Sequence, residues 1–556
     1  MIVALLAVPL AGSLLLLLPP ERYRVRDAAR FVRAAGILAS GLALLIALLM
    51  AVSADYGRAA GMQHVIDLSW APAIGLRFHV GVDGISLPLV VLTALLTFLC
   101  LLYSARVAPG GRALVGLLLL LEVGMLGTFV ALDLLLFFVF FEVVLIPMYF
   151  VIANWGGPGR RAAAYKFILY TLLGSGVLLV GLLIIAIDGG TLDMVMLAQR
   201  HGAGLSHGAQ IAAFLFVGLG LAVKAPMWPL HTWLPDAHTE APTVGSVLLA
   251  GVLLKMGTYG FVRIALPMAP EGAEFWAPWL GLLAVIGIIY GSLACLAQRE
   301  LKRMIAFSSV GHMGFVLLGI ATLTPVGVNA ALFGNIAHGL ITGLLFFLAG
   351  AIKERYGTGE LAAIGGGMLT RMPRLGSILT FACVASLGLP GLAGFWGEML
   401  ALLGAYRPAA GLPRETFVTF MVVGGLGAVL TMAYFLRLLY RITHGPPPSA
   451  TGPAAAGPAA PETAVPGTAA PGTAASEPAI TGPAAAEPAV PGTAAAETVV
   501  SGPAVSETAG RDLPDVRSYE YAAWVPLIVL TLIIGLWPKT LLALTDGPVR
   551  ALLGGG

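Results

Sequence analysis

Seven ionisable side chains lie well inside apolar stretches of this sequence. They are Glu122, Glu142, Lys224, Lys255, His312, His338 and Glu398. A charge at the centre of a bilayer costs about 2.5–3.5 kcal/mol on the insertion scale. Four unpaired charges would together cost on the order of 10–14 kcal/mol, which matches a typical folding margin. These groups must therefore be paired, hydrated or partly neutral.

Groups held in this way can change their protonation near neutral pH, which is what proton transfer requires. The type of basic residue supports this interpretation. Both intramembrane basic positions, 224 and 255, carry lysine although arginine is common elsewhere in the chain. A buried lysine can release its proton, whereas arginine cannot readily do so. The sequence therefore predicts a relay that moves protons through a membrane.

The acids and lysines also have structural explanations. Lys224 lies near the end of its apolar run and could extend to the cytoplasmic surface, which is harder for the more central Lys255. Glu142, in "FFVFFEVVLIPMYF", could form a purely structural ion pair, and Glu122 could pair locally or cap a helix. Glu398 follows a predicted helix break and could cap the next helix.

The histidines are less specific. His312 in "SSVGHMGF" and His338 in "NIAHGLITG" could be neutral and hydrogen-bonded to backbone carbonyls. His231 and His238 lie in the loop after the seventh apolar run, and a positioning role is the simpler explanation for both. We include these two histidines, with Glu122, as secondary candidates.

The composition indicates an integral membrane protein. The chain is 58% hydrophobic and 11% charged, and its mean hydropathy is +0.92. No stripe of basic and aromatic residues suggests nucleic-acid binding. The three cysteines lie far apart in apolar runs without a CxxC pattern, which predicts neither a disulfide framework nor an iron–sulfur site. We expect no metal site and no cofactor in this chain. The cysteines are Cys100, Cys295 and Cys383.

Hydropathy predicts an all-α polytopic protein with about fourteen spans. Their approximate limits are 2–18, 34–53, 84–104, 113–132, 134–153, 164–187, 209–225, 243–265, 276–297, 304–323, 327–351, 375–405, 416–441 and 522–543. The first is read as a membrane helix and not a signal peptide, because no basic residue precedes it. Basic residues concentrate in the odd-numbered connections. The positive-inside rule therefore places these loops in the cytoplasm and both termini outside.

Two spans are interrupted by proline. The seventh runs into Pro226 and Pro229, and the twelfth contains Pro390 followed by Gly391. Because proline removes a helical N–H, both helices should break there. The breaks lie five spans apart, so spans 4–8 and 9–13 would form two five-helix repeats related by inversion. Broken helices in inverted repeats mark the working site of many transporters. The alternative is a coincidence of prolines.

This organisation divides the chain into five parts. Between positions 445 and 510 the sequence is rich in alanine, proline and glycine, which predicts a disordered cytoplasmic linker without chemistry of its own. The predicted parts are 1–112 with spans 1–3, 113–265 with the first repeat, 276–441 with the second repeat, the 445–510 linker, and 522–556 with the last span and the C-terminus.

Three motifs carry a resemblance to a known family. The runs "VKAPMWPLHTWLPDAHTEAPT", "FFEVVLIPMY" and "LLKMGTYG" resemble the antiporter-like membrane subunits of respiratory complex I, NADH–quinone oxidoreductase. The resemblance covers the chain apart from the 445–510 linker. L-type, N-type and antiporter D subunits typically carry lysine after the twelfth-span break. Glu398 in "GFWGEML" instead resembles the M-type subunits, the counterparts of mitochondrial chain 4.

The resemblance implies one proton channel of a redox-driven pump in a bacterial plasma membrane. Glu142 and Lys224 would form a pair, and Lys255 would be the central relay. His312 and His338 would polarise water along the membrane midplane.

Glu398 would be the terminal carrier towards the outer side. NADH, FMN, iron–sulfur clusters and quinone would belong to partner subunits. The partners would be L- and N-type antiporter-like subunits and small membrane subunits within the lipid bilayer.

Two other classes of protein remain open from the residues. A subunit of an Mrp-type cation/proton antiporter would use the same charges, and Glu398 is the feature that disfavours it. A membrane cytochrome would use His312 and His338 as haem ligands, but it would give the intramembrane lysines no purpose.

Overall fold

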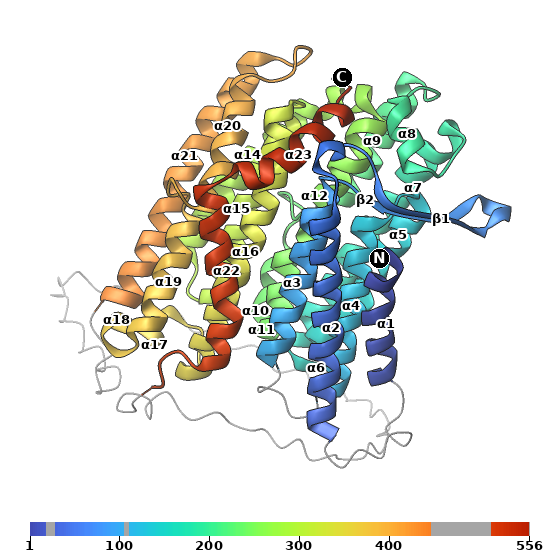
Figure 1. Ribbon diagram of the computed structural model, residues 1–556. Helices are drawn as coiled ribbons and strands as arrows, with labels where there is room; N and C mark the ends of the chain where they lie inside the picture. The colour runs from blue at the N-terminus through green and yellow to red at the C-terminus, as the bar shows by residue number, and fades with distance from the viewer. Residues whose placement is uncertain (18–27, 105–110, 446–512, 555–556) are drawn as a thin grey trace, which may run out of the picture. The chain divides into compact units, whose positions relative to one another are not determined.

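The computed structural model describes residues 1–17, 28–104, 111–445 and 513–554. These residues are mostly helical, because an apolar chain in lipid satisfies its backbone N–H and C=O groups within helices. Among them, twelve helical segments are long and apolar enough to cross a membrane. They run mainly side by side (Figure 1). They are α2 (Ala28–Ser53), α3 (Ser86–Ser104), α4 (Arg112–Val130), α5 with α6 (Leu134–Val143, Leu145–Trp155), α7 (Arg160–Gly189), α9 (His207–Lys224), α11 to α13 (Thr243–Met268), α14 (Pro270–Ala297), α15 (Leu301–Ala321), α16 (Pro325–Tyr356), α21 with η6 (Arg414–Leu439, Tyr440–His444) and α22 (Ser518–Leu536).

The remaining predicted spans correspond to shorter helices. The first is α1 (Ile2–Leu17), of 16 residues, and the twelfth is divided into α19 (Pro373–Ser386) and α20 (Ala393–Tyr406). The last predicted span, 522–543, is displaced: α22 ends at Leu536, and α23 (Lys539–Leu552) follows. Pro538 separates the two helices, because the residue before a proline is disfavoured in helical conformation. The other short helices are α8 (Met194–Arg200), α10 (Trp233–Glu240), α17 (Leu361–Ile364) and α18 (Met368–Arg371).

Both predicted helix breaks are present. After α9 ends at Lys224, residues 225–232 are not helical and α10 begins at Trp233. The indole N–H of Trp233 donates a hydrogen bond to the Val223 carbonyl at 3.0 Å, which satisfies one backbone group left free by the break. In the second break Gly388 and Gly391 have φ of 81° and 92°, a region that glycine enters without strain.

The segment Thr243–Met268 has an unusual internal structure. Two π-helical turns, η4 (Leu249–Leu253) and η5 (Phe261–Ala265), flank the α-helical turn α12 (Leu254–Gly260). Residues 244–268 of this segment are all buried by the helices around them. Single π-helical turns occur frequently at functional sites, because they change the direction in which side chains project.

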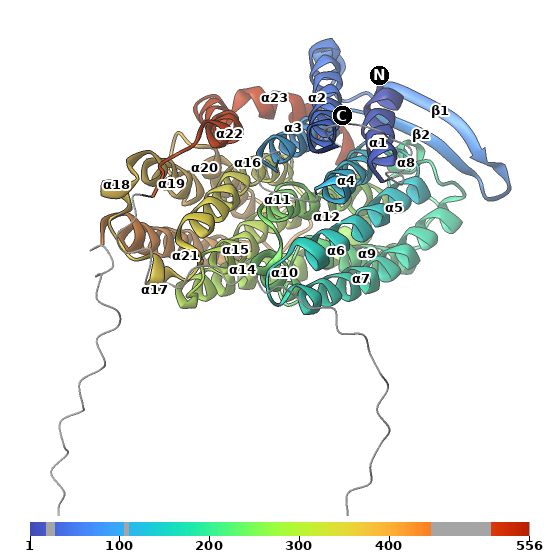
Figure 2. The ribbon, with the colours of Figure 1, turned by 90° about the horizontal axis from the view of Figure 1, so that it is seen from below.

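The expectation of an all-α chain omitted a β-hairpin. Strands β1 (Gln63–Ala71) and β2 (Leu76–Val82) pair antiparallel, and a turn ending at Gly75 joins them. The hairpin extends beyond α1 and α8 (Figure 2). It was missed because hydropathy detects long apolar runs, whereas these short strands mix polar and apolar residues between two spans.

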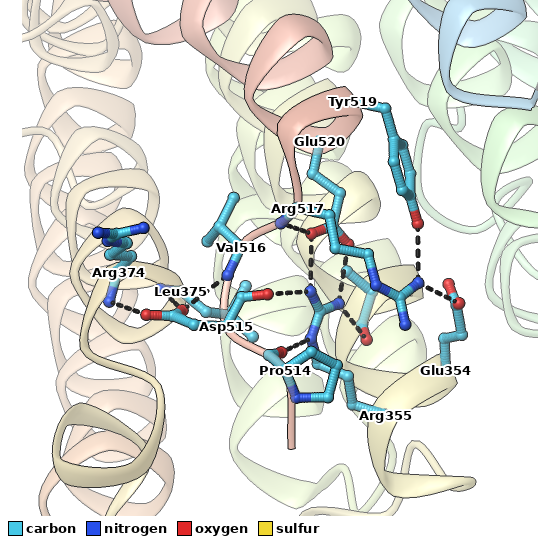
Figure 3. A network of polar contacts seen from close by, with 11 residues as sticks. Glu354, Arg355, Arg374, Leu375, Pro514, Asp515, Val516, Arg517, Tyr519 and Glu520 are labelled. Atoms are coloured by element: carbon cyan, nitrogen blue, oxygen red, sulfur yellow. Dashed lines mark hydrogen bonds and ion pairs between the residues drawn. The ribbon is translucent and has the colours of Figure 1, made fainter. Parts of the chain in front are cut away.

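A polar cluster joins the start of α22 to α16 and α19 (Figure 3). The Arg355 guanidinium on α16 binds the buried Glu520 carboxylate at 2.7 and 2.8 Å. The Asp515 carboxylate accepts hydrogen bonds from the backbone N–H groups of Arg374 and Leu375 in the first turn of α19. These contacts attach the segment before α22 to α16 and α19. The predicted linker, apart from Gly445, lies outside the described residues.

Candidate functional site

Lys255 and His338 meet between two helices. The Lys255 side chain is fully buried, and its Nζ donates a hydrogen bond to the Ala250 carbonyl on η4. The same Nζ lies 2.7 Å from Nδ1 of His338 on α16. The opposite ring nitrogen of His338, Nε2, is buried and has no partner among the described residues. His338 therefore has one nitrogen facing a proton donor and one nitrogen free to exchange with water.

His312 and Glu398 continue from this contact. The imidazole rings of His312 and His338 lie 5.7 Å apart in an edge-on arrangement. Nδ1 of His312 lies 3.0 Å from the Glu398 carboxylate, and its Nε2 lies 3.1 Å from the Ser386 hydroxyl. Lys255, His338, His312 and Glu398 thus form a continuous sequence of neighbouring groups from α12 to α20, which we call the central row.

Close helix packing brings Glu398 into the central row. A Cβ atom on Gly397 would lie 2.8 Å from the Cα of Gly334, so α20 and α16 approach one another at these two glycines. Ser386 and Glu398 stand on either side of the second helix break, at the end of α19 and in the second turn of α20. The break therefore places a hydroxyl and a carboxylate on opposite nitrogens of one imidazole.

A cavity with about 30 Å³ of space open to water adjoins this part of the row. His312, His338, Ser386 and Glu398 line it, together with the hydroxyl-bearing Thr342 and several apolar side chains. A buried space with this many polar groups can hold water, which would join His338 to His312 and Glu398 where no direct hydrogen bond does.

Glu142 and Lys224, which we call the first pair, are arranged differently. The Lys224 side chain is 2% exposed, and its Nζ lies 4.5 Å from the Phe141 ring centroid. Among the described residues, neither this Nζ nor one oxygen of Glu142 has a hydrogen-bond partner. The two groups influence one another electrostatically without direct contact. The alternative in which Lys224 extends to the cytoplasmic surface is therefore wrong.

The secondary candidates are all buried. Both carboxylate oxygens of Glu122 lack a partner within the described part of the chain, so it neither caps a helix nor pairs locally. The His231 ring packs against Tyr290 at 5.0 Å. The His238 ring stacks on Phe346 at 4.4 Å, and neither of its nitrogens has a hydrogen-bond partner in the part of the chain that the structure describes.

Lys302 was not among the predicted site residues, because it lies in the connection between the predicted spans 276–297 and 304–323. The Lys302 side chain is 4% exposed, and its Nζ donates to the Ala241 carbonyl at 2.8 Å, just after α10. His238 is close enough to Lys302 and to Lys255 to feel the charge of both lysines. Helical periodicity could have indicated that Lys302 is buried. Adjacent residues of a helix point in different directions, and the next residue, Arg303, is the exposed one.

The haem alternative fits this geometry poorly. Nδ1 of His338 faces Lys255 and Nδ1 of His312 faces Glu398, so one nitrogen of each ring is already engaged with another group. Within residues 1–17, 28–104, 111–445 and 513–554, no three histidine, cysteine or acidic side chains are grouped as metal ligands.

The fold and the buried charges define an antiporter-like membrane protein. Residues 131–426 match the family described as NADH:quinone oxidoreductase/Mrp antiporter, transmembrane. The fold is similar to a chain of respiratory complex I from Thermus thermophilus with bound NADH, with a TM-score of 0.77, 29% identity and full coverage of both chains. It is also similar to a chain of the Mrp complex from Dietzia sp. DQ12-45-1b, with a TM-score of 0.78 over 99% of this chain and 97% of that one. At 22% identity this second likeness concerns the fold alone.

Relatives of known name identify the family more narrowly. The chain is 43% identical to NADH-quinone oxidoreductase subunit M of Rhodobacter capsulatus over 419 residues, which is 74% of this chain and 80% of the relative. It is 39% identical to NADH-ubiquinone oxidoreductase chain 4 of Arabidopsis thaliana over 443 residues, 79% of this chain and 86% of the relative. The chain therefore belongs to the NADH-quinone oxidoreductase subunit M family. The expected family is confirmed.

Proposed function

We propose that this chain is a proton-translocating membrane subunit of a bacterial NADH:quinone oxidoreductase. The observation that carries the proposal is the central row, in which four titratable groups from α12, α16, α15 and α20 follow one another inside the membrane. Electron transfer would take place in partner subunits, and this chain would move protons in response to it.

In the central row, each group can accept a proton on one side and release it on the other. A proton on Nζ of Lys255 passes to Nδ1 of His338, across the 2.7 Å contact. His338 then releases a proton from Nε2 to water in the adjoining cavity, because an imidazole carries protons between its two nitrogens. His312 receives it beside Glu398, and Glu398 is the terminal carrier towards the outer face.

The first pair and the secondary residues would supply Lys255. Lys224 and Glu142 are coupled through space, so protonation of one changes the affinity of the other for protons. Lys302, at the start of α15, and His238, on α10, would lead from the cytoplasmic side towards Lys255. His231, just before α10, packs against Tyr290 and Phe307. Glu122, on α4, is a further buried acid.

The proposed topology has about fourteen spans, formed when α1 and the broken α19–α20 unit are added to the twelve long helical segments. Residues 113–265 and 276–441 would be inverted repeats. The helix breaks after Lys224 and after Ser386 support this arrangement, because they fall in corresponding spans. Residues 1–112 and 522–556 would flank the repeats, and both termini would face outwards from the plasma membrane.

The proposed partners are L- and N-type antiporter-like subunits and small membrane subunits, within the bilayer. NADH, FMN, iron–sulfur clusters and quinone would bind to other subunits of the complex. Purification from native membranes tests this assignment. Peripheral flavin and iron–sulfur subunits should accompany the chain, whereas the company of antiporter subunits alone would favour an Mrp-type antiporter.

Replacement of His338 tests the central row. In His338→Gln the side chain keeps polar atoms but cannot take up a proton. We expect the complex to assemble and to lose most redox-driven acidification of membrane vesicles. His207→Gln is the matched control, because His207 lies on the surface beside Glu271, outside the row. Normal acidification by assembled His338→Gln complex would contradict the proposal.

A further inference from the structure

A second cavity, with about 320 Å³ of space open to water, lies against Arg263, near the C-terminal end of the segment Thr243–Met268. Its rim includes Ala60, Gly61, Gln199 and His201, which are exposed. Two buried charged residues also line it, Asp83 and Arg263, with exposed fractions of 3% and 6%. In the proposed topology the cavity opens to the outer side, where a working pump accumulates protons.

The cavity comes close to the central row. Arg263 lies eight residues after Lys255 on one continuous helical segment, which corresponds to about 12 Å along the axis. Water that passed Arg263 would therefore reach the region of Lys255. The Lys255 Nζ bonds to the carbonyl of Ala250, an earlier residue, so the amine is directed away from the cavity.

Hydrogen bonds link the groups around Arg263. One nitrogen of the guanidinium lies 2.5 Å from the Asp83 carboxylate, and Nε donates to the Tyr259 hydroxyl at 3.2 Å. The Tyr259 hydroxyl donates in turn to the Phe129 carbonyl at 3.2 Å. The Asp83 carboxylate also accepts two backbone N–H groups at the start of α3. Both backbone N–H groups and the Arg263 guanidinium bind the same Asp83 oxygen, Oδ1, so this oxygen is fully engaged.

Aromatic rings pack against Tyr259, which lies one helical turn before Arg263 on the side of Lys255. The Tyr259 ring is 5.2 Å from Phe129 in an edge-to-face arrangement and 6.5 Å from Phe137. Packed rings exclude water, and a guanidinium keeps its positive charge because it does not release its proton. A fixed cation at a narrow place repels protons and other cations, as positive groups do in selective pores.

We propose that Arg263, held by Asp83 and Tyr259, is an electrostatic seal that prevents protons in the outer cavity from returning to Lys255. The inference depends on the proposed proton-translocating function and adds to it a residue that determines the direction of proton movement. Protons leave by Glu398, and the opening lined by Arg263 stays closed to them.

Passive proton permeability tests the seal. Purified complex is reconstituted into liposomes, and proton entry driven by a potassium diffusion potential is followed with an internal pH dye, without NADH. We expect Arg263→Gln to raise the leak per assembled complex by at least about threefold, because a neutral amide no longer repels protons. NADH oxidation should persist while the steady pH gradient falls.

Arg355→Gln is the matched control, because Arg355 and Glu520 form another buried arginine–carboxylate pair, 2.7 Å apart and away from the cavity. It should not raise the leak per assembled complex. Assembled Arg263→Gln without a leak would overturn the proposal in either of two ways. If pumping is normal, the arginine is only structural; if pumping is lost, it lies on the transfer path.

A double variant covers the failure of Arg263→Gln to assemble. Asp83→Asn with Arg263→Gln removes both charges, so no unpaired carboxylate remains buried. A leak in this variant supports the seal; a tight or unassembled double variant overturns it. Absence of NADH-driven acidification in the unmodified complex would refute the proposed function instead, and an unchanged leak beside normal acidification refutes only the seal.

Discussion

The central row and the first pair both contain an intramembrane lysine and an intramembrane glutamate, but only in the central row do these side chains contact another titratable group. In the central row, Lys255 touches His338 and Glu398 touches His312, at 2.7 and 3.0 Å. In the first pair, Lys224 lies against the Phe141 ring, and neither it nor one oxygen of Glu142 has a hydrogen-bond partner. The row is preassembled, whereas the pair needs water or a side-chain movement to connect. Control of proton transfer is therefore expected at the first pair.

The largest effect is expected at Lys224. In Lys224→Arg the charge is permanent, because the pKa of arginine stays above about 12, so the site cannot load and release a proton. Lys224→Ala removes the carrier altogether. We expect both complexes to assemble and to lose most vesicle acidification, with subunit content checked by immunoblot. Full activity of the arginine variant would mean that position 224 needs only a charge, and the comparison with the central row would fail.

A severe but smaller effect is expected from Glu142→Gln. The acid is the group whose charge acts on Lys224, and without it the lysine loses the interaction that favours its protonated form. Assembly should survive, because no hydrogen bond or ion pair joins the two side chains. Acidification should fall severalfold, measured as protons moved per NADH oxidised. Normal proton transfer in the assembled variant would remove Glu142 from the pair.

Ser386→Ala probes how strongly the central row is preassembled. Its hydroxyl contacts Nε2 of His312, while Glu398 holds the other nitrogen. Loss of one hydrogen bond to an imidazole should reduce the turnover of proton pumping by about two- to fivefold, since such a bond contributes ~1 kcal/mol. Thr380→Ala, in the same helix but bonded to its own backbone, is the control. A complete loss would show that Ser386 itself carries protons.

The smallest effect is expected outside both regions, at the hairpin. The Asp193 carboxylate, 3.2 Å from Nδ1 of His79, raises the pKa of this histidine above its usual value near 6.5. A raised pKa in the folded state stabilises the hairpin fully below about pH 6.5, and this stabilisation is lost as pH rises through the folded-state pKa. Hydrogen-exchange protection of β2 should therefore fall in the unmodified chain as the pH rises above about 6.5. His79→Gln should abolish this pH dependence; its persistence would contradict the assignment.

Much of the fold could be read from the sequence because membrane insertion is decided locally. Each apolar run must close its own backbone hydrogen bonds, so it becomes a helix at nearly the predicted position. Proline has an equally local effect, which is why the breaks near Pro226 and Pro390 could be predicted. The same reasoning failed where a feature is short and mixed in polarity, as in the β-hairpin, and where a helix begins before the predicted span, as with Lys302.

The sequence by itself also determined which residue types stand inside the membrane, and hence that the chain can move protons. Only the tertiary structure decided which of them touch. Lys255 and His338 are 83 residues apart, and His312 and Glu398 are 86 apart. Their contacts depend on the rotation and spacing of neighbouring helices, which close approaches such as that of Gly397 to Gly334 set. Lys224 and Glu142 are the opposite case. Hydropathy places both charges in the bilayer, but the packing of the helices keeps the two side chains from forming a hydrogen bond.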